Sequence, residues 1–381
     1  MHEMRNITIV EHLDPTSWAP GGIDNVVRDF ISHDNSIQFS IVGVTDKPDL
    51  RIGMWTNVDV EGRMVRFMPV ALFDRIQKPA GFRIPHSLRF VTGLIRYRRR
   101  IGRSTIHVHR VETGCFVSLF LRQPYVQYVH SNSRGLLGPK SDSMWKHLPW
   151  LHRRVERRAV GRAMSVAIFN KEDAPRLAKL ASSLTIAETW FDPRLFCPSP
   201  EGALKDIKEI VWVGRLDHGK DPWLVMSAAE EAWKNGQDWV FTIIGDGPLM
   251  KELQRHVTVS GLGNVRLLGA LPHEQVASVL RRSRVFLMTS YYEGSPTALL
   301  EALACALPVA ITRESDPDGL VRDGVNGSFI DQRDGDRVNH ALRQCFELKH
   351  VVVSEPVKSR SADRLVPVLA NLDHAARRFA T

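Results

Sequence analysis

Cysteine is scarce in this sequence. The 381 residues include 4 cysteines, which lie far apart and form no CxxC pair: Cys115, Cys197, Cys305 and Cys345. Zinc sites and disulfide frameworks need cysteines at close, regular spacing. The pattern therefore argues against both and suits a reducing, cytoplasmic environment.

Long apolar runs are lacking as well. No uncharged apolar run reaches the roughly 18 residues that mark a candidate membrane-spanning helix. Residues 1–13 mix acidic, basic and apolar side chains and lead directly into a strand-like run, so we do not expect a signal peptide. We expect a cytoplasmic protein and leave open a peripheral contact with the inner face of the membrane.

Acidic residues are rare between positions 51 and 163. This region contains 22 basic and 6 acidic residues, a net charge of +16, whereas the whole chain carries +9. Such a field favours an anionic partner: phospholipid, nucleic acid or a polyanionic acceptor. The alternative, that arginine-rich helix faces are simply solvated, carries similar weight.

Two motifs that mark other chemistries are missing. The first glycine turn, at 19–22, reads APGG and not GxGxxG, which disfavours a dinucleotide dehydrogenase. No DxD motif lies between hydrophobic strands, and we interpret the one formal match, DPD at 316–318, as a loop. We expect no metal site.

Strand-like and helix-like segments alternate in both halves of the chain. Apolar side chains recur at helical spacing in the helix candidates, which are 23–33, 221–236 and 273–283. The strand candidates are 6–13, 39–45, 104–110, 125–131 and 164–170, then 209–216, 239–247, 265–271, 284–290 and 307–312. Apolar strands that alternate with helices predict parallel sheets covered on both faces.

The alternation restarts after a linker at 191–202 that contains three prolines. We therefore predict an α/β protein with two Rossmann-like domains, residues 1–197 and 198–358, which face each other across a cleft. The last segment, 359–381, has a helical apolar face of Leu365, Val368, Leu369 and Leu372. Ligands of such sheets bind beyond the carboxyl ends of the strands, so the site should lie in those loops.

Two cations follow the strand candidate 209–216. Arg215 and Lys220 lie in the loop GRLDHGKD, where they can neutralise a diphosphate, although a pair of surface cations is an equally common reading. The next loop contains Gly245 and Gly247, which we interpret as an architectural turn.

Two glutamates, Glu293 and Glu301, flank the start of the helix expected after strand 284–290. Ser295 is a plausible N-cap and Pro296 a plausible first helical residue, so free backbone N–H groups would form a phosphate site. Carboxylates on either side of an anion site accept hydrogen bonds from hydroxyl groups, as a nucleotide sugar would require. An exposed helical glutamate is the alternative for Glu301, but its apolar neighbours disfavour it.

These loops resemble the retaining GT-B glycosyltransferases of family 4. The motifs are GRLDHGKD (214–221), IIGDGPL (243–249), EGSPTALLEALACALPVA (293–310) and LVRDGVNGSFID (320–331), in the family's order. The resemblance implies that Glu293 contacts the donor hexose and Glu301 the ribose, and that Arg215 and Lys220 hold the diphosphate. It also implies that segment 359–381 crosses back to the N-terminal domain, which would be the acceptor side.

The resemblance extends, more loosely, to the first half of the chain. APGGIDNVVRDF looks like the family's glycine loop, and His130 looks like its cleft histidine near the transferred sugar. The implied catalytic residues are Glu293, His130, Arg215 and Lys220. The implied donor-binding residues are Gly21, Gly22, Gly214, Arg215, Lys220, Glu293, Gly294, Ser295, Pro296, Thr297 and Glu301.

Three positions depart from the family pattern. Thr189-Trp190 stands where Asn-Gly is frequent, Ala306 where glycine is usual, and Asp316-Pro317-Asp318-Gly319 where a glycine pair and a glutamate are common. The first change bears on the hinge. The others put the identity of the donor in question more than the activity, because the diphosphate and glutamate positions are kept.

The resemblance implies a hexosyltransferase that moves a sugar from a UDP- or GDP-linked donor to an acceptor hydroxyl, with no metal and no cofactor. His130 would position the sugar, and domain closure would complete the site. The basic segments 94–103 and 151–162 suggest an acceptor on a membrane-associated lipid or glycan. The alternative is a protein or small-molecule acceptor.

Two other functions remain open at this point. A nucleotide-sugar epimerase on the same fold would release no sugar to an acceptor. A protein that binds nucleic acid or another anionic surface through residues 51–163 would bind without affinity for sugar nucleotides, but few aromatic residues for base stacking lie there.

Overall fold

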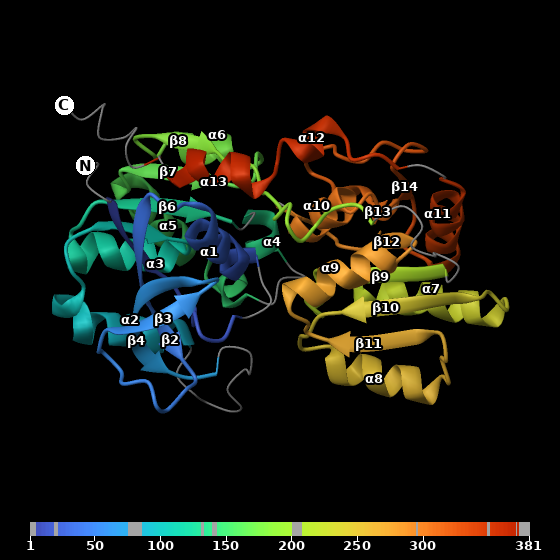
Figure 1. The fold of residues 1–381 in the computed structure, drawn as a ribbon, viewed down its shortest axis with the longest axis horizontal. Coiled ribbons are helices and arrows are strands. Elements are labelled where there is room, and N and C mark those ends of the chain that lie inside the picture. Colours follow the sequence, from blue (N-terminus) through green and yellow to red (C-terminus); the bar gives the residue numbers. More distant parts are fainter. Residues whose placement is uncertain are drawn as a thin grey trace. The chain divides into compact units, whose positions relative to one another are not determined.

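The computed structural model describes residues 5–18, 22–74, 86–130, 133–138, 143–199, 208–294, 296–348, 351–370 and 372. The chain divides into two compact units (Figure 1). The first comprises Met1–Asn132, His147–Ala187 and Leu365–Thr381, and the second comprises Ser133–Lys146 and Glu188–Arg364. The chain thus changes unit after Asn132, Lys146, Ala187 and Arg364, whereas the sequence placed boundaries after 197 and 358.

The first unit is built on an eight-stranded sheet with the strand order β3-β4-β2-β1-β5-β6-β7-β8. Its strands are β1 (Arg5–Val10), β2 (Ile37–Thr45), β3 (Thr56–Val60), β4 (Arg63–Leu72), β5 (Thr105–Val108), β6 (Tyr125–Val129), β7 (Ser165–Ile168) and β8 (Leu184–Ile186). All neighbours are parallel except β3 and β4. The sequence reading missed β3, β4 and β8. Glu61 and Gly62 join β3 to β4 with φ of 52° and 78°, the backbone of a tight hairpin turn.

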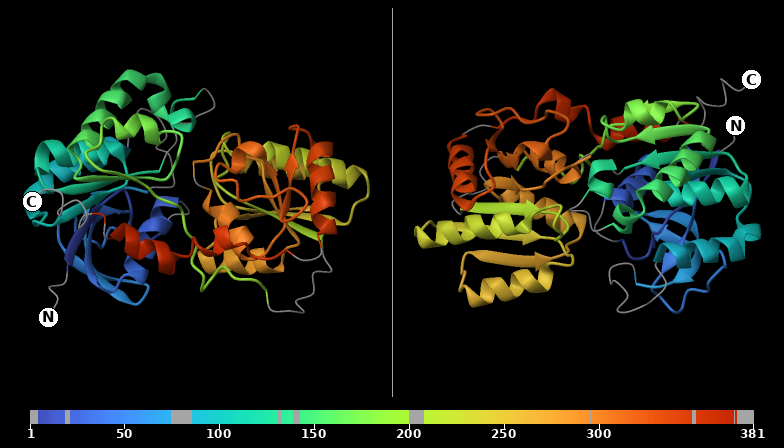
Figure 2. Two further views of the ribbon diagram at one scale, coloured as in Figure 1. Left: turned by 90° about the horizontal axis from the view of Figure 1, so that it is seen from above. Right: turned by 180° about the vertical axis from the view of Figure 1, so that it is seen from behind.

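Helices cover both faces of this sheet (Figures 1 and 2). They are α1 (Gly22–His33), α2 (His86–Tyr97), α3 (Val111–Phe116), α5 (Pro149–Arg162), α6 (Ala174–Ala178) and α13 (Ala362–Ala370), with short turns η1 (Arg98–Arg100) and η2 (Val117–Leu121). Side chains of α2, α3, α5 and α6 share one core with the strands. In α13 the predicted apolar face is wrong at one position: Val368 is 59% exposed, and Val366 is buried in its place.

The second unit has six parallel strands in the order β11-β10-β9-β12-β13-β14. They are β9 (Lys208–Val213), β10 (Trp239–Ile244), β11 (Val265–Gly269), β12 (Val285–Met288), β13 (Val309–Thr312) and β14 (Gly327–Ile330). One core lies beneath α9 (His273–Arg282), α10 (Thr297–Ala304) and α12 (Glu355–Lys358). The opposite core lies beneath α7 (Pro222–Lys234), α8 (Met250–Val259) and α11 (Gly335–Glu347).

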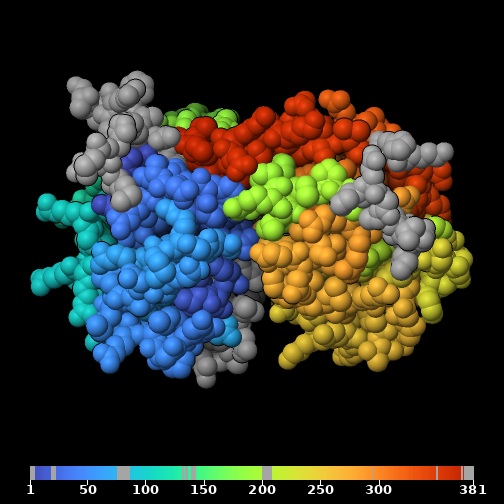
Figure 3. Space-filling view, viewed as in Figure 1, coloured from blue at the N-terminus to red at the C-terminus, as the bar shows by residue number. Residues whose placement is uncertain are grey.

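Outer faces of the two units are visible in the space-filling view. The region of β2, β3 and β4, in blue, forms one face of the first unit, and α8 and α9, in gold and orange, lie on the surface of the second (Figure 3).

Within the described residues, no helix has both the length and the apolar character needed to cross a bilayer.

The strand order fixes where each sheet opens for a ligand. In the second unit the chain leaves β9 toward β10 and β11 on one side, and later builds β12, β13 and β14 on the other. The loops after the adjacent strands β9 and β12 therefore lead to opposite sides, and such a switch point is where open α/β sheets bind ligands. The first unit has its switch point between β1 and β5.

Candidate functional site

Two loops meet at the switch point of the second unit: residues 214–221 after β9 and 289–294 after β12. The Tyr291 N–H donates to the Gly219 carbonyl at 2.9 Å. The Thr289 hydroxyl lies 2.9 Å from the Lys220 carbonyl oxygen and 3.0 Å from that of Asp221. These bonds hold the two loops against each other.

Lys220 and Glu293, both predicted site residues, contact each other. The Lys220 Nζ lies 2.5 Å from Glu293 Oε1, and the Ser290 hydroxyl donates to the same oxygen at 2.6 Å. The Glu293 side chain is 9% exposed and that of Lys220 is 30% exposed. A cation and a hydroxyl-accepting carboxylate thus lie side by side at the switch point.

Arg215 projects from the same loop and is mostly exposed, with its Nε 3.6 Å from Asp217. Gly214 lies where the backbones of two loops touch, because its N–H donates to the Ile244 carbonyl. At Gly245, which has φ of +135°, a Cβ atom would lie 1.9 Å from the Gly214 carbonyl oxygen. The interpretation of Gly245 as architectural therefore agrees with the structure.

The start of α10 differs from the prediction. Pro296 occupies the N-cap position, with φ −78° and ψ 95°, and Thr297 is the first helical residue. Pro296 is not helical because its ψ is extended, while its carbonyl already accepts the first helical bond, from Leu300 at 3.2 Å. Gly294 lies in the loop before it, and Ser295 lies outside the described residues.

Glu301 is buried, with 5% of its surface exposed, so it is not an exposed helical glutamate. Its Oε1 lies 3.3 Å from the Nε2 of His273, the first residue of α9. The Phe196 ring packs against this imidazole edge to face. Sequence reasoning missed His273, because its partner is 28 positions away and no local motif marks it.

In the first unit, His130 follows β6 and contacts His109, which follows β5. The His109 Nδ1 lies 2.9 Å from His130 Nε2, and Phe169 stacks on the His130 ring. Burial, with a smaller effect of the Arg110 charge, lowers the pKa of His130 to about 3. Burial likewise lowers the pKa of His109 well below its ordinary value. Both imidazoles are therefore neutral near pH 7.

An ion pair spans the switch point of the first unit. The Arg110 Nε donates to Glu11 Oε1 at 2.6 Å, and the His12 N–H donates to the same oxygen at 2.8 Å. Burial raises the pKa of Glu11, and Arg110 offsets part of that effect. Of the predicted glycine loop, Gly22 begins α1, and Gly21 lies outside the described residues.

The DPD segment serves the local fold. Asp316 accepts hydrogen bonds from the N–H groups of Leu320 and Val321, at 2.9 and 2.8 Å. Asp318 forms an ion pair with Arg360 at 2.7 Å. In the described part of the chain, no group of three or more histidine, cysteine, aspartate or glutamate side chains is placed to hold a metal ion.

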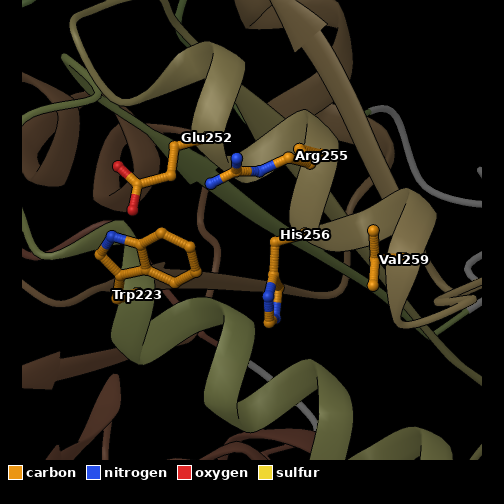
Figure 4. A pocket seen from close by; sticks show the side chains of 5 residues that line it. All are labelled: Trp223, Glu252, Arg255, His256 and Val259. Carbon is orange, nitrogen blue, oxygen red and sulfur yellow. The ribbon is translucent and has the colours of Figure 1, made fainter.

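A pocket of about 250 Å³ lies between α7 and α8 (Figure 4). Trp223 contributes from α7, and four side chains from α8: Glu252, Arg255, His256 and Val259. The Trp223 and His256 rings meet edge to face, and His256 contacts Glu230 at 2.5 Å. This pocket belongs to the helical layer and not to the strand ends, so we do not assign the site to it.

Comparisons with known proteins place this fold. The two α/β units form a GT-B fold: the solved structure of sucrose-phosphate synthase from Thermosynechococcus elongatus matches with a TM-score of 0.70 and 17% identity, covering 99% of this chain and 97% of that one. Residues 199–358 match the family model described as glycosyl transferases group 1. Residues 199–358 therefore form a domain of this glycosyltransferase family, and the predicted GT-B fold is confirmed.

Two curated relatives share parts of the sequence. The alpha-D-kanosaminyltransferase of Streptomyces kanamyceticus is 27% identical over 256 residues, which is 62% of this chain and 66% of that protein. The UDP-Gal:alpha-D-GlcNAc-diphosphoundecaprenol alpha-1,3-galactosyltransferase of Escherichia coli is 33% identical over 132 residues, 34% of each chain. The chain thus matches between a third and two thirds of the length of these relatives.

Proposed function

We propose that this protein is a retaining, metal-independent glycosyltransferase. It moves a hexosyl group from a nucleotide diphosphate sugar to an acceptor hydroxyl. The observation that carries the proposal is the Lys220–Glu293 pair at the β9/β12 switch point. That pair places a cation for phosphate beside a carboxylate for sugar hydroxyls, in the position where open α/β sheets bind nucleotides.

The donor phosphates gain negative charge as the sugar leaves. Lys220 supplies a point charge, and the exposed Arg215 can grip two phosphate oxygens. We propose that the first N–H groups of α10, which begins at Thr297 after the second of these loops, add to this phosphate site. Fixed cations and N–H groups stabilise the charge where it develops, which is usually the largest contribution to catalysis. We propose that these cations take the role of a metal ion.

Retention follows from same-face attack. The bond between the anomeric carbon and the phosphate oxygen breaks, the acceptor oxygen bonds to that carbon, and the acceptor proton passes to the leaving diphosphate. His130, with a pKa of about 3, is too weak a base to take this proton. It has a positioning role, through hydrogen bonds from a neutral imidazole.

The uridine base and a lipid-linked acceptor are supported by one relative. The name of the Escherichia coli galactosyltransferase gives UDP-Gal as donor and a diphosphoundecaprenol-linked sugar as acceptor. We propose the same classes here: a UDP-linked hexose and a membrane-associated lipid or glycan.

The basic face of the first unit supports this acceptor. We define it by exposed residues of α5 and η2: Trp150, Arg153, Arg154, Arg157, Arg158, Leu119 and Phe120. Trp150 is 59% exposed and Phe120 49%. Arginines interleaved with exposed apolar side chains suit the interface of an anionic bilayer. We propose that this face touches the membrane and brings the enzyme to its acceptor.

Turnover tests the activity. Hydrolysis and transfer are measured with UDP- and GDP-linked glucose, galactose, N-acetylglucosamine and mannose, and NMR gives the anomeric configuration of the product. Lys220→Met should abolish turnover. Lys208→Met is the matched control, because Lys208 pairs with Asp238 at 2.9 Å near the opposite end of β9. Equal turnover by both variants, or an inverted product, would contradict the proposal.

Vesicle sedimentation tests the membrane contact. The natural protein should sediment with vesicles of phosphatidylglycerol and phosphatidylcholine but not with phosphatidylcholine alone. The double variant Arg154→Glu, Arg157→Glu should lose this binding. Lys251→Glu with Arg266→Glu, on the second unit, changes the net charge equally and should retain it. Binding that is unchanged in the first pair would refute the assignment of the face.

Turnover also separates the rival functions. An epimerase would convert one sugar nucleotide into another without releasing the nucleotide. A nucleic-acid-binding protein would bind oligonucleotides and no sugar nucleotide. The family match over 199–358 favours neither.

A further inference from the structure

Arg333 contacts the loops after β9 and β12 although it lies in a distant part of the sequence of the second unit. It lies three residues after β14, the edge strand of the sheet. Its guanidinium donates to the Thr289 carbonyl at 2.7 Å, the Ser290 carbonyl at 2.5 Å and the Asp221 carboxylate at 3.0 Å. One side chain thus ties together both loops of the switch point.

The aspartate that Arg333 holds has an unusual backbone. Asp221 has φ of +49° and ψ of +59°, the left-handed region, and precedes Pro222. Aspartate is one of the few residues other than glycine that adopt this conformation, and hydrogen bonds support it there. Two interactions support it: Arg333 binds its carboxylate, and the Thr289 hydroxyl binds its carbonyl. Because Lys220 immediately precedes Asp221, this backbone conformation fixes where the Lys220 side chain begins.

Arg333 also holds the loop after β12, through Tyr291 and Ser290. The Tyr291 ring covers the guanidinium, with the Arg333 Cζ 3.7 Å from the ring centroid. The Ser290 carbonyl binds Arg333, while the Ser290 hydroxyl binds Glu293. Arg333 therefore acts on Glu293 through Ser290 and on Lys220 through Asp221, although it contacts neither directly. Its side chain is only 25% exposed.

We infer that Arg333 is a positioning residue for the nucleotide-sugar site, which sets the spacing of Lys220 and Glu293. The inference rests on the proposed function. Fixed cations and carboxylates stabilise a transition state only when held in place, and a shift of about 1 Å can cost on the order of a hundredfold in rate. Loss of Arg333 should therefore impair donor use without removing any group that touches the donor.

Donor hydrolysis needs no acceptor and gives the test. Arg333→Ala should raise the KM for the donor and weaken UDP binding, with kcat/KM lower by about ten- to a hundredfold. Arg333→Lys keeps the charge but cannot form the three-way fork, so it should restore only part of the loss. The matched control is Arg313→Ala, in the neighbouring segment, whose side chain is 66% exposed; it should leave KM unchanged.

A double-mutant cycle separates positioning from stability. Asp221→Asn and Arg333→Lys should have non-additive effects on kcat/KM, measured at a temperature where circular dichroism shows every variant folded. Additive effects, or a donor KM and UDP affinity in Arg333→Lys and Arg333→Ala equal to the natural protein's, would overturn the inference. If Arg333→Ala does not fold, Arg333→Lys decides alone. If the natural protein binds no sugar nucleotide, the proposed function itself falls, a result distinct from failure at Arg333.

Discussion

Ala306 is strained in a way that can be relieved by removing one methyl group. It has φ of +56°, the left-handed region that side chains disfavour. Its N–H donates to Leu303 at 3.0 Å and the next N–H, of Leu307, donates to Ala302 at 3.1 Å. This pair of bonds ends α10 in the motif that usually takes glycine. We predict that Ala306→Gly stabilises the protein.

Two opposing effects set the magnitude. Relief of the left-handed conformation is worth about 1–2 kcal/mol. The added freedom of glycine in the unfolded chain costs about 0.4–1 kcal/mol. The free energy of unfolding of the second unit should therefore rise by about 0.5–1 kcal/mol, or roughly 2 °C in Tm for a unit of this size.

Urea denaturation followed by circular dichroism and tryptophan fluorescence measures this change. Ala304→Gly is the control within the same helix: it is buried, helical, and should lose at least about 1 kcal/mol. Glu61→Gly, at φ 52° in the hairpin turn of the first unit, should gain stability by the same mechanism. A loss of stability in Ala306→Gly would refute the left-handed end of α10.

Three further predictions concern the polar groups of the two units. Arg110→Ala leaves Glu11 buried without its cation and should lower the free energy of unfolding by about 2 kcal/mol. The loss is smaller than for a fully buried pair because the Arg110 side chain is 45% exposed. Adding Glu11→Gln to the Arg110→Ala variant should recover most of this loss. Below about pH 6.5 the unfolded chain binds a proton at His130 and the folded chain does not, because the pKa of His130 in the fold is about 3. The free energy of unfolding therefore decreases as the pH is lowered from 7 to 5. His130→Gln should reduce that decrease by on the order of 1–2 kcal/mol. An unchanged pH dependence would mean that His130 titrates normally in the fold. Thr289→Val removes the hydroxyl that binds the Trp212 indole N–H and the carbonyls of Lys220 and Asp221. The free energy of unfolding, measured by urea denaturation, should fall by about 1–3 kcal/mol. An unchanged free energy of unfolding would mean that these groups find other partners.

The sheet-forming strands were the most predictable part of the fold. Runs such as 209–216 and 239–247 are apolar because both faces of a parallel sheet are covered, and the structure has β9 and β10 there. The hairpin of β3 and β4 was not predicted, because its turn residues are Glu61-Gly62 and not Asn-Gly or Asp-Gly, the pairs that indicate a hairpin most strongly. The exposure of Val368 could not be read from helical spacing alone, since the pattern does not say which side meets a neighbour.

The site was predictable where its chemistry is local in sequence. Lys220 and Glu293 each lie in a loop that follows an apolar strand, and the fold joins them at 2.5 Å. Arg333 and His273 were missed because each matters only through partners that are distant in the sequence. Ala306 was noticed as a departure from the usual glycine, and its φ gives the physical reason why glycine is usual there.

The two units share one arrangement at their switch points. In the first, Glu11 after β1 pairs with Arg110 after β5; in the second, Lys220 after β9 pairs with Glu293 after β12. In both units, two adjacent strands whose following connections lead to opposite sides of the sheet are followed by loops with opposite charges. In the first unit the Glu11 carboxylate is buried and pairs with a half-exposed Arg110, and we expect this pair to serve stability. In the second unit Lys220 and Glu293 lie in the loops after β9 and β12, and we assign this pair to the donor.

Hydrogen exchange measured by mass spectrometry tests the donor site most directly. On addition of a UDP-linked hexose, peptides that cover 214–221 and 289–301 should become protected, and Lys220→Met should remove that protection while Lys208→Met retains it. Protection confined to the α7/α8 pocket, or no protection with any sugar nucleotide, would contradict the assignment of the nucleotide-sugar site to the β9/β12 switch point.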